Sequence, residues 1–339
     1  MKPALGPSLP WAPMSTPRWL LVLLPVLLLA GCGGSDDGGG GKSDAQPAAT
    51  AEAFPSAKGK TMRQLRGSAP EGPIVSPAVS SVEQGENRFA FALFDVSRKP
   101  VRDAQVAVYT AARNGKGLRG PYPARQESLD VKPQFRSQTT AADTQAAKTV
   151  YVAQIPFESD GPHLMTAMAR VNGKLVTGSL LEVDVGAAKG KGPPEIGDPA
   201  VDVHTPTLAD VGGDAAKIDT RIPPAEELLK TDLAAVLGKQ PVVLAFATPA
   251  LCVSRTCGPT VDIVEQVRAK YGDKAAFIHM EVYNDNKREN GFRPQLGKWR
   301  LPTEPWVFVI GKDGKIADRF EGVVSAAELD RAVAKATGG

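Results

Sequence analysis

Between residues 73 and 186 the chain alternates apolar and polar positions over short segments. Segments such as RFAFALFD place apolar side chains at every second position, as strands with one buried face do. The later runs follow turn signals such as Asn172-Gly173. Several short strands at this spacing predict a β-sandwich. The predicted strands are 88–95, 104–109, 149–153, 164–170 and 175–185.

Beyond residue 195 the apolar runs become longer and alternate with helical periodicity. The run PVVLAFA at 241–247 is continuously apolar, as in a central strand covered on both faces. An apolar stripe then follows at helical spacing over 259–272, where Gly272 ends it. The order β-α-β-loop-β-β-α predicts an α/β module over 196–339. The other predicted elements are a helix within 223–237, strands 275–282, 306–310 and 316–320, and a helix over 325–335.

Two further segments lack any periodic pattern. Residues 187–195 (AAKGKGPPE) predict a linker between the two modules. Residues 32–72 begin with a stretch rich in Gly, Ser and Asp that has few large apolar groups, and they predict a flexible tether. The fold class predicted from the whole chain is therefore multidomain, with a β-sandwich followed by an α/β fold.

The first 31 residues have the pattern of a secretory signal peptide. Lys2 and Arg18 precede an apolar run over 20–29, which is too short to span a bilayer about 30 Å thick. The folded part is then expected outside the cytosol. Charge adds one exclusion: 40 Lys and Arg against 37 Asp and Glu, with no long basic run, predict no nucleic-acid partner.

The chain has three cysteines, and an exported protein can keep disulfides that the cytosol would reduce. Cys252 and Cys257 lie in the segment TPALCVSRTCGP, between the strand at 241–247 and the following helix. A thiolate is the nucleophile in disulfide exchange, and a helix N-terminus lowers the pKa of a cysteine placed there. Cys257 fits that place, with Arg255 as a further positive charge and Cys252 as the resolving thiol. A helix that starts at Ser254 would instead make Cys252 the exposed nucleophile and Cys257 the protected resolver.

The N-terminal motif resembles a known processing signal. Leu29-Ala30-Gly31-Cys32 is similar to the lipobox of bacterial lipoproteins. That resemblance implies that Cys32 is lipidated and becomes the mature N-terminus, so that acyl chains anchor the protein to the extracytoplasmic face of the cell membrane.

The α/β module resembles the extracytoplasmic redoxin branch of the thioredoxin superfamily. The matching stretches are IGDPA at 196–200, PVVLAFATP at 241–249, the cysteine pair and PTEPWVFVIGKDGKI at 302–316. The resemblance implies a thioredoxin-like fold and a cis-proline at Pro305 that faces the cysteines and positions the partner chain. The stretch PVRDAQVAVY at 100–109 resembles bacterial immunoglobulin-like modules, which implies an immunoglobulin-like sandwich.

The sequence also departs from the thioredoxin pattern. Thioredoxins carry Cys-x-x-Cys, whereas four residues separate Cys252 from Cys257, and Gly258-Pro259 follows the second cysteine instead of lying between the two. Trp306 replaces the small residue often found after the cis-proline. The long charged segment 284–300 is expected on the same sheet edge as the cysteines, where it could shape partner choice.

These features predict a membrane-anchored thiol-disulfide oxidoreductase that acts on protein thiols or disulfides outside the cytoplasm. The exchange requires no bound cofactor and no metal. Three alternatives stay open: copper delivery through the cysteine pair with His279 and Met280 as soft-ligand partners, a peroxidase with Cys257 as its reactive thiol, and a binding lipoprotein whose cysteines form a structural disulfide.

Overall fold

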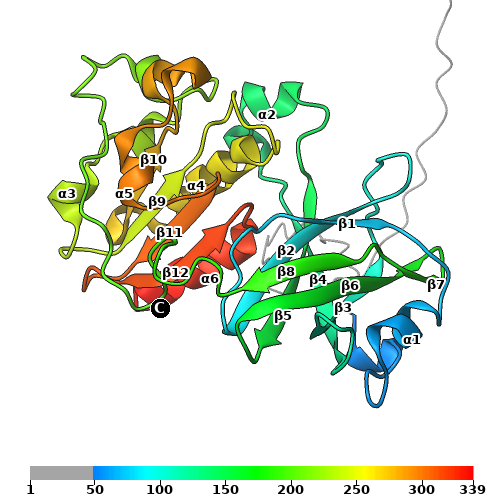
Figure 1. Cartoon of the computed structure of the whole chain (residues 1–339). Coiled ribbons are helices and arrows are strands. Elements are labelled where there is room, and N and C mark those ends of the chain that lie inside the picture. Colours follow the sequence, from blue (N-terminus) through cyan, green and yellow to red (C-terminus); the bar gives the residue numbers. More distant parts are fainter. Residues whose placement is uncertain (1–48, 339) are drawn as a thin grey trace, which may run out of the picture. The chain divides into compact units, whose positions relative to one another are not determined.

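The computed structural model describes residues 49–338 (Figure 1). The predicted signal peptide, 1–31, and the predicted lipidation site, Cys32, lie outside the described residues. Within 49–338, none of the helices is both long enough and apolar enough to cross a membrane.

Eight antiparallel strands form the first module. They hydrogen-bond as one continuous sheet in the order β1-β2-β5-β4-β3-β6-β7, with β8 paired to β6. The predicted sandwich is therefore present. Its layers are not separate sheets, because hydrogen bonds link the strands of one layer to the strands of the next. The strands are β1 (Ile74–Pro77), β2 (Gly85–Phe94), β3 (Gln105–Ala112), β4 (Arg119–Ser128), β5 (Thr149–Phe157), β6 (Gly161–Val171), β7 (Lys174–Thr177) and β8 (Leu181–Val185).

The two faces of this sheet belong to different apolar cores. Phe89, Phe91 and Val106 are buried in the inner core of the module. Their neighbours Ala90 and Ala107 are buried in two other clusters, because successive side chains of a strand point to opposite faces. The alternation in the sequence thus encodes an inner face and an outer face, and the outer face is covered as well.

Residues 49–67 cover part of that outer face. Phe54, Met62 and Leu65 are buried against Tyr109 and the rest of its cluster. The segment contains η1 (Ala51–Ala53) and α1 (Met62–Arg66), whose N-cap residue Thr61 accepts a hydrogen bond in a capping box. This packing corrects the tether expected over 32–72: from residue 49 onward the chain has enough apolar side chains to join the folded module.

The second module has a thioredoxin-like fold. Its sheet has the order β10-β9-β11-β12, with β9 and β10 parallel and the other pairs antiparallel. The predicted order β-α-β-loop-β-β-α is confirmed by β9, α4, β10, β11, β12 and α6. The elements are η3 (Ala215–Lys217), η4 (Glu226–Leu229), α3 (Leu233–Val236), β9 (Val242–Phe246), α4 (Cys257–Tyr271), η5 (Gly272–Lys274), β10 (Ala276–Met280), η6 (Asn284–Asn286), η7 (Arg288–Asn290), α5 (Pro294–Lys298), β11 (Trp306–Ile310), β12 (Ile316–Glu321) and α6 (Ala326–Ala336).

Helices cover both faces of the second sheet. The apolar side chains of α4 and α6 are buried in one core with Val243 and Val307, whereas Leu233 of α3 and Trp299 next to α5 are buried in the other with Leu244. All five residues of β9 are fully buried. This burial on both sides explains why 241–247 is apolar without alternation.

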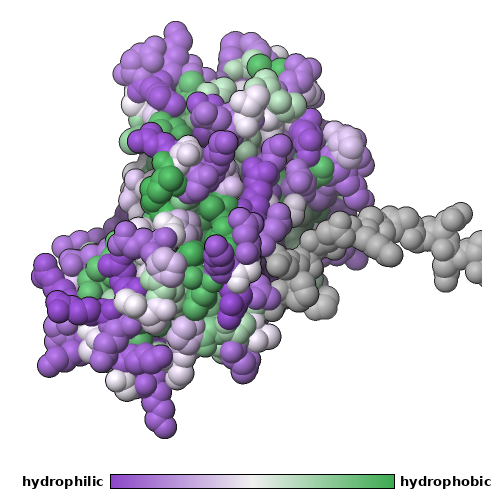
Figure 2. All heavy atoms as spheres, turned by 90° about the vertical axis from the view of Figure 1, so that its right-hand side faces the viewer, coloured by the Kyte–Doolittle hydropathy of each residue, from purple (hydrophilic) through white to green (hydrophobic). Residues whose placement is uncertain are grey.

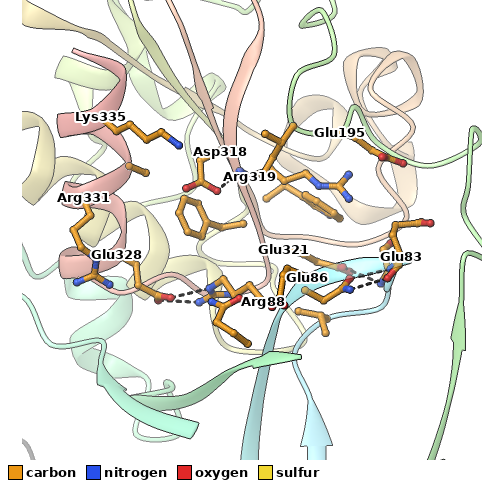
Figure 3. A pocket seen from close by; sticks show the side chains of 18 of the residues that line it. Glu83, Glu86, Arg88, Glu195, Asp318, Arg319, Glu321, Glu328, Arg331 and Lys335 are labelled. Atoms are coloured by element: carbon orange, nitrogen blue, oxygen red, sulfur yellow. Dashed lines mark hydrogen bonds and ion pairs between the residues drawn. The ribbon is translucent and has the colours of Figure 1, made fainter. Parts of the chain in front are cut away.

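The core of α4 and α6 also includes side chains of the first module. Ala90 of β2 and Val152 of β5 are buried in the same cluster as Val261 and Val264 of α4. At the edge of this contact, the Arg88 guanidinium makes two hydrogen bonds of 2.8 and 2.9 Å to the Glu328 carboxylate of α6 (Figure 3). The two modules therefore share one hydrophobic core.

The predicted linker, 187–195, contains turns but no helix or strand. Its backbone is nevertheless held, because the carbonyl oxygens of Pro193 and Pro194 accept hydrogen bonds from the Arg319 guanidinium at 3.3 and 3.1 Å. Figure 2 shows one face of the molecule, on which hydrophilic side chains dominate and apolar side chains lie in small groups between them.

Candidate redox site

Two cysteines at the junction of β9 and α4 lie close to the carboxylate of Glu304, which precedes β11 by two residues. The sulfur atoms of Cys252 and Cys257 and a carboxylate oxygen of Glu304 all lie within 4.8 Å of one another. Both cysteines are free thiols in this structure. The two sulfurs expected from the sequence to form one site are therefore brought together.

Cys257 is the first residue of α4, as expected, but its side chain is fully buried in the core below the helix. Burial raises the pKa of the Cys257 thiol well above its ordinary value, and the negative charge of Cys252 raises it further. The lowered pKa expected for Cys257 is therefore not found. Loss of hydration outweighs the favourable field of the helix N-terminus.

Cys252 is the more exposed cysteine and has the opposite electrostatic setting. Its sulfur accepts a hydrogen bond from the backbone N–H of Cys257 at 3.4 Å and lies 3.1 Å from the hydroxyl oxygen of Ser254. The pKa of Cys252 is lowered to about 5, mainly because the Cys257 thiol donates to its thiolate, with the Ser254 hydroxyl and two backbone N–H groups adding to this against the effect of burial. Cys252 is consequently a thiolate at neutral pH.

The helix N-terminus thus acts on the cysteine that precedes it. Thr256 is the N-cap residue of α4, and the N–H groups of Thr256 and Cys257 stabilise the Cys252 thiolate. The sequence left two assignments open, and this geometry favours Cys252 as nucleophile and Cys257 as resolver. It does so although the helix begins at Cys257 and not at Ser254.

Glu304 was not identified from the sequence. It directly precedes Pro305, and the peptide bond between them is cis, as the resemblance implied. The Glu304 side chain is half-buried, and its pKa is raised to about 7 by burial first and then by the Cys252 thiolate. Its position beside the predicted cis-proline was the available signal, because that proline was expected to face the cysteines.

Two arginines approach the same loop, and both are engaged. The Arg255 guanidinium pairs with the Asp143 carboxylate of the first module at 2.9 Å. Arg288, from the segment 284–300, donates to the backbone carbonyl of Leu251 and opposes the rise in the pKa of Glu304. Arg255 was expected to add positive potential at the cysteines, but its charge is paired with Asp143, and it is not among the causes of the lowered pKa of Cys252.

His279 does not join the cysteines. It is buried on β10, where its Nε2 lies 3.0 Å from the carbonyl oxygen of Ala247 and its Nδ1 lies 3.5 Å from Asp219. Within 49–338, His279 belongs to a second group of close donor atoms, with Asp219 and Glu281. Burial alone would lower the pKa of His279, but the Asp219 carboxylate outweighs it and the pKa is raised.

This placement removes the geometric basis of the copper alternative. Met280 is adjacent to His279 on the strand, so their side chains point to opposite faces of the sheet, and Met280 is buried in the core of α3 and α5. The peroxidase alternative also loses support. It required Cys257 as the reactive thiol, and that side chain is fully buried.

The carboxylate of Asp262 holds α4 in place below the site. It lies in the second turn of α4 and forms a buried ion pair with Arg221 at 2.9 Å. The same carboxylate accepts hydrogen bonds from the backbone and hydroxyl groups of Ser137, while Arg221 donates to the carbonyl oxygen of Phe135. Residues of the first module are therefore built into the support of the redox helix.

Comparisons with known proteins give distant structural neighbours. No protein-family model matches the chain, and no curated relative matches it. Among solved structures, a thiol:disulfide interchange protein of the thioredoxin family from Chlorobium tepidum TLS is 18% identical, with 42% of this chain and 99% of that chain covered and a TM-score of 0.30. A protein described as the thiol:disulfide interchange protein DsbE from Chlorobium tepidum is also 18% identical, over 43% and 99% of the two chains, with a TM-score of 0.28.

A third structural neighbour is a protein of another kind. The filamin domain of Lin-41 is 11% identical, with 34% of this chain and 97% of that chain covered and a TM-score of 0.18. At these identities and TM-scores, the neighbours establish nothing about the activity of this chain. The case for its chemistry rests on its own residues.

Proposed function

We propose that the protein is a thiol-disulfide oxidoreductase that exchanges electrons with protein cysteines outside the cytoplasm. One observation carries this proposal: a half-buried Cys252 sulfur with a pKa lowered to about 5 lies within 4.8 Å of a second, buried thiol. A permanent structural disulfide does not need a stabilised thiolate, whereas an exchange site does.

In the first step, the Cys252 thiolate attacks one sulfur of a partner disulfide. A bond forms between Cys252 and that sulfur, the partner disulfide breaks, and its other sulfur leaves as a thiolate. The low pKa of Cys252 ensures that the attacking form is present at neutral pH. No cofactor takes part in this step.

In the second step, Cys257 resolves the mixed disulfide. The Cys257 thiol loses its proton and attacks the Cys252 sulfur, so that the Cys252–Cys257 disulfide forms and the bound partner sulfur leaves as a thiolate. Two electrons have then passed from the protein to its partner. Because the pKa of Cys257 is raised, this step needs a base, and the Glu304 carboxylate is close enough to accept the proton.

Pro305 completes the proposed site. It is buried next to Glu304, and we assign it the role that the resemblance implies, which is to align the partner chain beside the sulfurs. The direction of electron flow depends on the reduction potential of the cysteine pair, and the same steps in reverse would oxidise a partner.

We further propose that the folded modules are held at the extracytoplasmic face of the cell membrane. The support is the signal-like pattern of residues 1–31 and the lipobox-like motif that ends at Cys32. A diacyl anchor would provide stable attachment without a transmembrane helix.

The test is a redox titration combined with trapping. The Cys252–Cys257 pair should equilibrate with a glutathione buffer, and a Cys257→Ser variant should accumulate a mixed disulfide at Cys252 when it meets a protein disulfide. Cys252→Ser is the matched control and should trap nothing. A pair that stays oxidised under strong reductant in the folded protein would instead identify a structural disulfide.

A further inference from the structure

The first module reaches the redox site through one insertion. Residues 129–148, between β4 and β5, leave the sheet at a backbone hydrogen bond of 2.9 Å from Leu129 N–H to the Lys148 carbonyl oxygen. We call this segment the insert. It contains η2 (Pro133–Phe135) and α2 (Gln138–Ala142), and it lies against the start of α4.

The insert is attached directly to the loop between the two cysteines. The Ala147 N–H donates to the carbonyl oxygen of Arg255 at 3.3 Å, and Asp143 pairs with the guanidinium of the same residue at 2.9 Å. Arg255 has a φ of 62°, a conformation that few non-glycine residues adopt. Both its backbone and its side chain are thus held by the insert.

The approach of the insert to α4 is very close. A Cβ atom on Gly258, the residue after Cys257, would lie 2.8 Å from the hydroxyl oxygen of Thr140. That distance is too short for a normal contact. The absence of a side chain at Gly258 therefore allows α2 to pack this closely against the redox helix.

A cavity of about 730 Å³ opens between the insert and the cysteine loop. Cys252 lines it, so the residue that carries the reactive sulfur forms part of the cavity wall. Its volume lies in the upper part of the range of about 300–1,000 Å³ found for ligand sites, and it exceeds what a small disulfide needs. The insert contributes Gln138, Thr139, Thr140, Ala142, Asp143 and Ala146 to its wall.

The walls of the cavity carry little free charge. Arg255 is paired with Asp143, and Arg288 donates to a backbone carbonyl. Many of the other lining groups are hydroxyl or apolar, and the apolar side chains of Ile222 and Val253 are 54% and 75% exposed at the site. Among the lining residues, Arg288 is the charged side chain without a carboxylate partner, because a carbonyl oxygen does not neutralise its charge. The cavity therefore offers an ionic thiol one guanidinium, whereas an uncharged stretch of polypeptide could bury its side chains against the many apolar groups.

We propose that the insert is a substrate-selecting wall, and that the cavity takes an extended, uncharged polypeptide segment next to the cysteine that Cys252 attacks. This inference rests on the proposed function and names the class of substrate for the same site. The chemical step is unchanged: Cys252 forms a bond to the partner sulfur and the other sulfur of that disulfide leaves as a thiolate. The segment that flanks the attacked sulfur lies in the cavity during this step.

Two probes with the same leaving group test the proposal on the full chain in detergent. One is an uncharged peptide whose single cysteine is capped with nitrothiobenzoate, and the other is the same capped cysteine as its neutral, blocked amino acid. We expect the protein to release nitrothiobenzoate from the peptide at least about tenfold faster than from the amino acid. A rate ratio of this size reports the additional binding of the peptide in the transition state.

Ala142→Trp should remove this preference, because Ala142 is exposed on the insert and lines the cavity. Ala141→Trp is the matched control, since Ala141 is exposed but does not line it, and it should keep the preference. Ala142→Trp and Ala141→Trp should unfold at the same temperature as the unmodified protein, which shows that the fold is kept, and the amino-acid probe should react with Ala141→Trp at the unmodified rate.

The outcomes separate this proposal from the proposed function. Equal rates with the two probes in the unmodified protein, or a preference that survives Ala142→Trp, would overturn the selecting role and leave the exchange chemistry intact. If Cys252 reacts with neither probe, the proposed function fails together with this inference. As a second readout, amide hydrogen exchange of residues 138–146 should slow when the peptide is trapped on Cys252 in Cys257→Ser. It should not slow when the amino acid is trapped.

Discussion

At the scale of single residues, the site depends on two identical side chains with opposite properties. Cys252 has a lowered pKa and Cys257 a raised one, although their sulfurs lie within 4.8 Å. The difference follows from position: the buried thiol donates its proton to the neighbouring sulfur, and the helix N–H groups point at that same sulfur. One shared hydrogen bond thus stabilises the thiolate of Cys252 and the protonated form of Cys257.

The pKa of Cys252 should therefore depend on Cys257. In the unmodified protein, the rate of Cys252 alkylation should be constant above neutral pH and fall with a midpoint near 5. Cys257→Ala removes the main donor, so the midpoint should rise towards 9.0, the ordinary thiol value, and Ser254→Ala should raise it by less. Val253→Ala, an exposed neighbour, should leave it unchanged. A midpoint unaffected by Cys257→Ala would contradict this account of the thiolate.

Glu304 should control the second step through its own protonation. With dithiobis(nitrobenzoate), attack by Cys252 and resolution by Cys257 each release one nitrothiobenzoate, so a stopped-flow instrument separates the two phases. The second phase should slow as pH falls and Glu304 becomes protonated. Its midpoint should lie below the value of about 7 found beside the thiolate, because Cys252 is uncharged in the mixed disulfide.

Glu304→Gln should slow the second phase by about 10²-fold or more above that midpoint and remove the inflection, since a positioned base contributes about 10²–10⁴-fold. The first phase should persist. Glu289→Gln, which changes an exposed carboxylate in the segment 284–300, serves as the matched control. Identical second phases in Glu304→Gln and the unmodified protein would remove Glu304 from the mechanism.

At the scale of elements, the contact of α2 with the N-terminus of α4 can be tested by a double-mutant cycle. Gly258→Ala should destabilise the protein by about 1–3 kcal/mol, because its Cβ would lie 2.8 Å from the Thr140 hydroxyl oxygen. In a Thr140→Ala background that oxygen is absent, and the same substitution should be neutral or stabilising by up to about 1 kcal/mol through helix propensity. Urea denaturation measures both. An effect of Gly258→Ala that is equal in the two backgrounds would contradict the close contact.

The sequence predicted those elements whose pattern is local. The alternation in β2 and β5 and the apolar run in β9 identified strands correctly. The burial of β9 matches its pattern, whereas the middle of β2 and of β5 is buried on both faces and not on one. The strand β4 was not predicted. Its sequence RGPYPARQES contains two prolines and few apolar residues, and only its pairing with β3 and β5 makes it a strand.

Other features depended on contacts between distant segments. The helix expected within 223–237 is divided into η4 and α3, because Asp232 caps α3 with its side chain while also bonding Thr205 from an earlier segment. The roles of the two cysteines likewise depended on the depth of Cys257 in a core that includes the first module. Neither the spacing of the cysteines nor their order along the chain indicates how deeply Cys257 is buried.

At the scale of the whole molecule, the first module is part of the redox machinery. Its strands β2 and β5 bury side chains under α4, and its insert binds the loop between the cysteines. The sequence had indicated a β-sandwich separated from the second module by a linker. A shared core instead implies that the two modules open together, because exposing one side of that core exposes the other.

Amide hydrogen exchange can measure this coupling. Val152→Ala removes two methyl groups from the shared core on the side of β5, at a cost of about 2 kcal/mol. We expect the slowest amides of β9 and β11 to lose as much protection as the slowest amides of β3, because all of them exchange through opening of the common core. Val96→Ala makes the same change at a side chain that is 89% exposed and should alter neither set. If Val152→Ala lowers protection in β3 alone, the modules unfold independently, and the first one does not stabilise the redox site.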